Sequence, residues 1–168
     1  AGACYAWGET EEKEEYTPFT YKYYLGDLNE DGNYNNSEEY ENIGRDISGT
    51  IYDVVRTKWG GTWRMPTKEE LEELINNCEY RWTEIKGVKG AKYTASNGNS
   101  IFIPAAELQC GSYFHVSSGR QAFIFSSSLY PHAEPVYNSS YYLVSTEGGP
   151  IIDVFDRIIG LSVRPVYV

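Results

Sequence analysis

The chain has 168 residues, enough for one domain with its own hydrophobic core and too few for two comfortable ones. Its 14 Lys and Arg against 24 Asp and Glu give a formal net charge of −10, so most of its surface repels a nucleic-acid backbone and an anionic membrane. No apolar run approaches the roughly 20 residues of a transmembrane helix, and 16 Tyr beside 16 Gly are as typical of a contact surface as of a Tyr-rich β protein.

The first 50 residues predict little regular structure. Residues 1–16 lack the basic start and apolar stretch of a signal peptide, as expected of a mature or excised domain. A Tyr-rich strand is expected at 16–25. A long acidic loop follows at 26–50, dense in Gly, Asn, Asp and Glu and without a helical or strand period. Such a loop inside a compact domain is usually functional or held in place by something.

Two short helices are predicted next. Apolar residues at helical spacing predict one at 51–59, with Thr50 as its N-cap and a glycine after it as its stop. The second, at 67–77, begins with a capping box from Thr67 to Glu70 and carries an apolar stripe. We expect four side chains of the helices and their flanks to be buried: Trp63, Leu71, Leu74 and Cys78.

The rest of the chain alternates short β-rich runs with Gly, Ser, Asn and Pro. These runs predict strands at 81–86, 91–95, 100–103, 122–127, 140–145 and 161–168. Helices followed by a strand-rich half predict an α+β fold, with the two helices packed on a twisted, mainly antiparallel sheet. No repeat and no linker divides the chain, so 1–168 is expected to form one domain.

One motif in the acidic loop points to a metal. The sequence DLNEDGNYNNSE at 27–38 fits the D-x-N-x-D-G-x5-E pattern of a calcium loop at every defined position. No clear helices flank it, and a surface loop rich in Asx-turns is the competing interpretation. No other motif requires a cofactor. A Ca²⁺ ion in this loop would be held by Asp27, Asn29, Asp31, Asn33, Asn35 and Glu38, with Asn33 using its backbone carbonyl.

Five stretches, spread from residue 5 to residue 166, together resemble one protein family. They are WGGTWRMPTKEEL at 59–71, YAWGET at 5–10, DISGT at 46–50, GNSIFIPAA at 98–106 and SVRPV at 162–166. The first resembles the WGGxWRMPTxxE signature of the Fibrobacter succinogenes major paralogous domain family, whose members are mostly exported proteins of gut bacteria. The resemblance implies a C-type-lectin-like fold, in which a loop-rich face carries binding, and an exported chain displayed at a cell surface, on a pilus or on a phage.

Signs of catalysis are weaker than signs of binding. The segment 64–70 also resembles the RLPTEAEWE helix of formylglycine-generating enzymes, whose active-site cysteines lie near their C-terminus, but no cysteine follows Cys110. His115 and His132 have no Cys or His partner at zinc spacing, and no nucleophile-elbow pattern surrounds the serines at 126–128. We therefore expect a non-catalytic protein. A degenerate enzyme scaffold, a glycan-processing accessory and a structural subunit of a surface polymer are the alternatives.

The binding region is expected at 108–159, where aromatic, apolar and charged residues interleave without an amphipathic period. Strict alternation fails in 151–159, and an exposed mixed patch competes there with an ordinary edge strand and hairpin. Some relatives with this fold are variable proteins of diversity-generating retroelements. Arg157 belongs to the family pattern itself, and every other residue of 151–159 is a permitted product of that diversification. A protein or glycan ligand is expected to contact Tyr113, His115, Arg120, Phe123, Tyr130, His132, Asp153, Phe155, Asp156 and Ile158.

Overall fold

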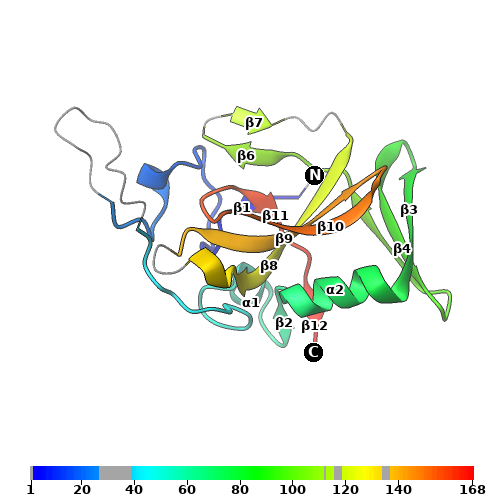
Figure 1. The fold of residues 1–168 in the computed structure, drawn as a ribbon, viewed down its shortest axis with the longest axis horizontal. Coiled ribbons are helices and arrows are strands. Elements are labelled where there is room, and N and C mark those ends of the chain that lie inside the picture. The colour runs from blue at the N-terminus through cyan, green and yellow to red at the C-terminus, as the bar shows by residue number, and fades with distance from the viewer. Residues whose placement is uncertain (1, 27–38, 112, 116–118, 134–136) are drawn as a thin grey trace.

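The structure is a computed structural model that describes residues 2–26, 39–111, 113–115, 119–133 and 137–168. The predicted calcium loop at 27–38 lies outside these residues. Two short α-helices and antiparallel strand pairs make the fold α+β, as predicted (Figure 1). In chain order the elements are β1 (Cys4–Tyr5), η1 (Pro18–Thr20), α1 (Val54–Trp59), β2 (Trp63–Arg64), α2 (Lys68–Asn77), β3 (Cys78–Ile85), β4 (Val88–Ala95), β5 (Ser100–Pro104), β6 (Leu108–Cys110), β7 (Tyr113–His115), β8 (Gln121–Leu129), η2 (Pro131–Ala133), β9 (Ser139–Thr146), β10 (Gly149–Asp156), β11 (Leu161–Ser162) and β12 (Val166–Tyr167).

Two three-stranded sheets, β10-β9-β8 and β3-β4-β5, form the frame, and the pairs β1-β11, β12-β2 and β6-β7 complete it. Five of the predicted strands fall on β3, β4, β5, β8 and β9, and the last, at 161–168, is divided between β11 and β12. The strand predicted at 16–25 is wrong. That segment holds the single turn η1, and among the described residues its β pairing is limited to isolated bridges at Tyr16 and Tyr24.

The N-cap of α1 is Asp53 rather than Thr50, so the helix begins three residues later than predicted. The Asp53 carboxylate is fully buried. It accepts hydrogen bonds from backbone N–H groups of residues that precede it and residues that follow it in the sequence. The late start leaves Ile51 outside α1, and both Ile51 and Trp59, the last residue of the helix, are exposed. The four N–H donors to Asp53 lie at 2.8–3.1 Å and belong to Gly49, Val55, Arg56 and Met65.

The N-terminus of α2 follows its prediction. The Thr67 hydroxyl accepts the N–H of Glu70 at 3.3 Å, and the Glu70 carboxylate accepts the N–H of Thr67 at 2.9 Å. Arg64 donates two further hydrogen bonds to this carboxylate, at 2.6 and 2.7 Å. The guanidinium of Arg64 therefore holds the pKa of the Glu70 carboxyl below its usual range, aided by the Thr67 N–H.

The β10-β9-β8 sheet separates two hydrophobic clusters. Opposed residues of paired strands share a face, so Phe125 and Tyr142 pack toward the N-terminal segment, whereas Leu143 and its neighbours pack under α2. Leu71 of α2 is 2% exposed, as predicted. The other three residues expected in the core differ. The prediction for Trp63 is wrong, because its side chain is 37% exposed, and Leu74 and Cys78 are only partly buried.

Candidate ligand-binding surface

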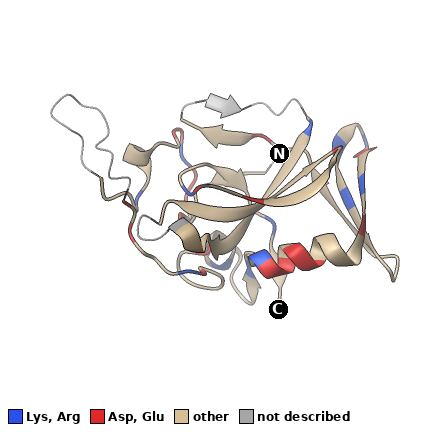
Figure 2. Cartoon of the chain, in the orientation of Figure 1, with Lys and Arg blue, Asp and Glu red and all other residues tan. Residues whose placement is uncertain are grey.

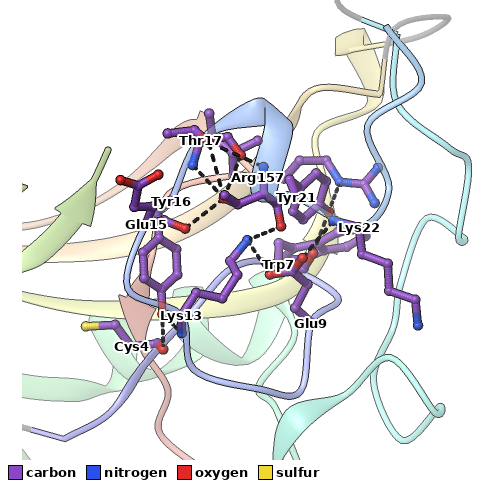
Figure 3. Close-up of polar contacts among 12 residues, drawn as sticks. Cys4, Trp7, Glu9, Lys13, Glu15, Tyr16, Thr17, Tyr21, Lys22 and Arg157 are labelled. Carbon is purple, nitrogen blue, oxygen red and sulfur yellow. Dashed lines mark hydrogen bonds and ion pairs between the residues drawn. The ribbon is translucent and has the colours of Figure 1, made fainter. Parts of the chain in front are cut away.

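The C-terminal end of β10 is fixed by Arg157, whose side chain is fully buried (Figure 3). Its Nε–H donates to the hydroxyl oxygen of Tyr21 at 2.6 Å. Its Nη1 donates to the carbonyl oxygens of Glu41 and Tyr137, each at 3.0 Å. The guanidinium carbon also lies 4.7 Å from the centre of the Trp7 ring, within the range of a cation–π interaction. A single side chain thus joins three separate segments to the end of this strand.

Backbone hydrogen bonds reinforce the same junction. The N–H of Arg157 donates to the carbonyl of Asn138 at 2.9 Å, and its carbonyl accepts the N–H of Trp7 at 2.9 Å. The Tyr21 hydroxyl, which accepts from Arg157, donates in turn to the Trp7 carbonyl at 2.6 Å. Burial raises the pKa of this hydroxyl well above its ordinary value, although the nearby guanidinium opposes the shift. The hydroxyl therefore stays protonated and able to donate.

Beside this junction lies the ion pair of Glu9 and Lys13, at 2.7 Å (Figure 3). The second carboxylate oxygen of Glu9 accepts the backbone N–H of Lys22 at 2.8 Å. The Lys13 ammonium donates to the carbonyl of Thr20 at 3.0 Å and lies 5.5 Å from the centre of the Tyr21 ring. These contacts join Glu9, Lys13 and the segment at 20–22 to one another.

Strand β10 is the edge of its sheet: it pairs with β9 along its whole length, and no other described strand pairs with it. Its burial alternates along the strand, with outward residues exposed and intervening residues partly covered. Ile151 is 56% exposed and Phe155 is 39% exposed, and Asp153 between them is exposed as well. These three side chains, which we call the β10 row, project from one face because alternate residues of a strand do so.

The β10 row rests on Tyr142 of β9. The rings of Tyr142 and Phe155 meet edge to face, with centres 5.8 Å apart. The Tyr142 hydroxyl donates to Oδ2 of Asp153 at 3.5 Å. Burial raises the pKa of Tyr142 to about 12, and the charge of Asp153 adds to the shift. The row is therefore backed by a neutral, buried aromatic residue.

A second group of aromatic residues surrounds the connection between β8 and β9. The Tyr130 ring lies 5.3 Å from that of His132 and 5.4 Å from that of Tyr141, measured between centres. The Lys68 ammonium, from the first turn of α2, lies 5.3 Å from the centre of the Tyr141 ring. His132 is exposed and Tyr130 half-buried, so this group also offers contact area to a partner.

The structure separates the predicted ligand contacts into different environments. Phe123 and Ile158 are 4% and 8% exposed and belong to the core, so their side chains do not face a partner. Asp156 is half-buried and accepts the hydroxyl of Tyr40 at 3.4 Å. Arg120 is exposed at the opposite end of β8 from Tyr130, and the strand between them is about 30 Å long at 3.3 Å per residue.

The remaining predicted contacts, Tyr113 and His115, lie on β7. Ile151 and Tyr142 lie within the predicted binding region 108–159 but were not among the ten residues predicted to contact the ligand. The register of β9 against β10 brings them to the row, and the chain alone carried no signal for that register beyond the aromatic pair at 141–142.

Among the described residues, no group of three or more His, Cys, Asp or Glu side chains is placed to hold a metal ion. The three cysteines form no disulfide with one another, and each is half-buried. Burial raises the pKa of the Cys4 thiol, which lowers its reactivity.

No protein-family model matches this chain, and neither the curated proteins nor the solved structures compared with it contain a match. Within the described part of the chain, no helix is both long enough and apolar enough to cross a membrane.

Proposed function

We propose that the chain is a non-catalytic, exported binding domain of C-type-lectin-like fold, which contacts a protein or glycan through the β10 row. The observation that carries this proposal is the exposure of Ile151, Asp153 and Phe155 on an edge strand held at both ends. A tight turn to β9 holds one end, and the buried contacts of Arg157 hold the other.

Physical reasoning favours this surface as a contact site. An exposed aliphatic and an exposed aromatic side chain gain free energy when a partner removes them from water, by roughly 25 cal/mol for each Å² of apolar area. Their strand is already ordered, so binding costs little backbone entropy. Asp153 lies between them and selects partners that donate hydrogen bonds or carry positive charge.

The resemblance to the major paralogous domain family supports the finer parts of the proposal. Two short helices with antiparallel sheets agree with the C-type-lectin-like fold that it implies. Diversification by a retroelement is compatible with the β10 row, since residues 151, 153 and 155 are exposed. Arg157, which the family pattern carries, is the buried residue of the junction.

A glycan and protein array tests the proposal. The wild-type chain is compared with a triple variant that carries Ile151→Ser, Asp153→Asn and Phe155→Ala. We expect the wild type to give discrete signals that the triple variant loses. The matched control is Ile85→Ser with Val88→Ser, because these residues are 39% and 46% exposed at the distant end of the β3-β4 hairpin.

The control variant should keep the wild-type signals. A wild-type chain that binds nothing on either array, or a triple variant that binds as well as the wild type, would contradict the assignment of the β10 row. If the control variant lost a signal that the triple variant kept, the binding surface would lie on the β3-β4 hairpin.

A further inference from the structure

A groove lies at the opposite end of β8 from Tyr130. Its volume is about 560 Å³, a size common among small-molecule sites, which span roughly 300–1,000 Å³. Three segments build it: the β3-β4 hairpin, the start of β8 and the turn between β9 and β10. Six of the residues that line the groove are Trp82, Lys89, Arg120, Gln121, Thr146 and Glu147.

Hydrogen bonds hold the walls of the groove together. The Tyr80 hydroxyl of β3 donates to the carbonyl of Thr146, which joins the hairpin to the β9-β10 turn. The Thr146 hydroxyl donates to the carbonyl of Gly149 at 3.2 Å and accepts the N–H of Gly148 at 3.1 Å. Gln121 of β8 lies directly opposite Thr146 in the sheet. The groove is therefore bordered by ordered backbone on these sides.

The charges of the groove differ from those of the chain as a whole. Lys89 and Arg120 are both exposed, and neither forms an ion pair with any described residue. Glu84 lies opposite Lys89 in the strand register, and Glu147 also borders the groove. Figure 2 shows Lys and Arg beside Asp and Glu on β3 and β4, whereas the first turns of α2 are mainly acidic. In a chain of net charge −10, two unpaired cations at one groove mark a place for a negatively charged ligand.

We propose that this groove binds a small acidic sugar, with its carboxylate on Arg120 and Lys89 and its ring against Trp82. Arg120 presents a planar fork that matches a carboxylate. The Glu147 carboxylate and the Gln121 amide oxygen accept hydrogen bonds from sugar hydroxyls. An inorganic anion that lacks hydroxyl groups would be repelled by the Glu147 carboxylate and would donate no such hydrogen bond. Trp82 is half-buried and offers the apolar contact that a sugar ring requires.

This site is separate from the β10 row and stands without it. The test is a titration of the full chain with sodium glucuronate. The readout is the NMR signal of the Trp82 indole N–H, which is assigned by its absence in a Trp82→Phe variant. Glucose and sodium sulfate serve as the neutral and the inorganic comparison. We expect a saturable shift with glucuronate, weaker at high salt, and at least tenfold weaker binding of glucose and of sulfate.

Arg120→Gln should weaken glucuronate binding about tenfold or more, since it removes a charged hydrogen-bond donor. Arg81→Gln is the matched control because Arg81 is exposed on the other face of the hairpin and changes the net charge equally. No saturable shift with glucuronate, equal binding of glucose or sulfate, or equal loss in both variants would each overturn the proposal.

Discussion

The buried guanidinium of Arg157 donates its Nε–H to the hydroxyl oxygen of Tyr21 at 2.6 Å, across 136 residues of sequence. Tyr21 extends this contact, because its hydroxyl donates to the Trp7 carbonyl at 2.6 Å. The end of β10 is thereby joined to the N-terminal segment. The exposed residues earlier on β10 take no part in this junction, which is why we expect them to change binding and Arg157 to change stability.

Replacement of Arg157 by Lys should destabilise the fold strongly. A lysine cannot reproduce the planar fork that reaches Tyr21 and two backbone carbonyls, so buried acceptors lose their donors. We expect a loss of about 3 kcal/mol or more in the free energy of unfolding in urea. Arg164→Lys is the control, since Arg164 is exposed, and should cost less than about 0.5 kcal/mol. Equal stabilities for the two variants would show that the junction is not structural.

Two leucines of α2 should differ in their importance. Leu71 is 2% exposed within the cluster under the helix, whereas Leu74 is only partly buried. Leu71→Ala should therefore cost about 2–5 kcal/mol, and Leu74→Ala clearly less. Chemical denaturation of both variants measures the difference. If Leu74→Ala proved the more costly, the packing of α2 described here would be incorrect.

Acid should remove the stabilising effect of Glu70. Its pKa is lowered in the folded state by Arg64, so its contribution is fully present above the ordinary Glu pKa of about 4.3 and is lost as pH falls through the folded value. Glu70→Gln should cost about 1 kcal/mol at neutral pH by loss of the ion pair with Arg64, since the Gln amide oxygen can still accept the Thr67 N–H of the capping box. This cost should shrink in acid. Urea unfolding across the acid range measures it, with exposed Glu73→Gln as a control that changes little. A cost of Glu70→Gln that is independent of pH would contradict the role of its charge.

Alkali should unfold the protein through its buried tyrosines. Burial raises the pKa of Tyr16, Tyr93 and Tyr142 to about 12. Because the folded values exceed the ordinary pKa of about 10, their contribution is intact below pH 10 and is lost as pH rises toward 12. The ultraviolet absorbance of tyrosinate should rise in two steps, the second of them with unfolding. A single step near pH 10 in the folded protein would contradict this burial.

Local signals in the chain were enough to predict α2, because a capping box and an apolar stripe lie within a dozen residues. They were insufficient for α1: both Thr50 and Asp53 are good N-caps, and the choice of Asp53 depends on the distant N–H of Met65. The alternation of exposed and covered residues along β10 could not be predicted from the sequence for a similar reason. Its covered residues, such as Ile152, are as apolar as its exposed ones, such as Ile151, and only the cluster under α2 distinguishes them.

Joint replacement of Phe155 and Tyr130 by Ala tests the binding surface most directly, with array signal and melting midpoint measured on the same samples. We predict loss of the wild-type array signals with a fall of only about 2–4 °C in the midpoint, as for a change of roughly 1 kcal/mol in a domain of this size. Retention of the signals by a folded double variant, or unfolding of that variant, would contradict the prediction. In the second case both residues would belong to the core, and the contact surface would lie elsewhere.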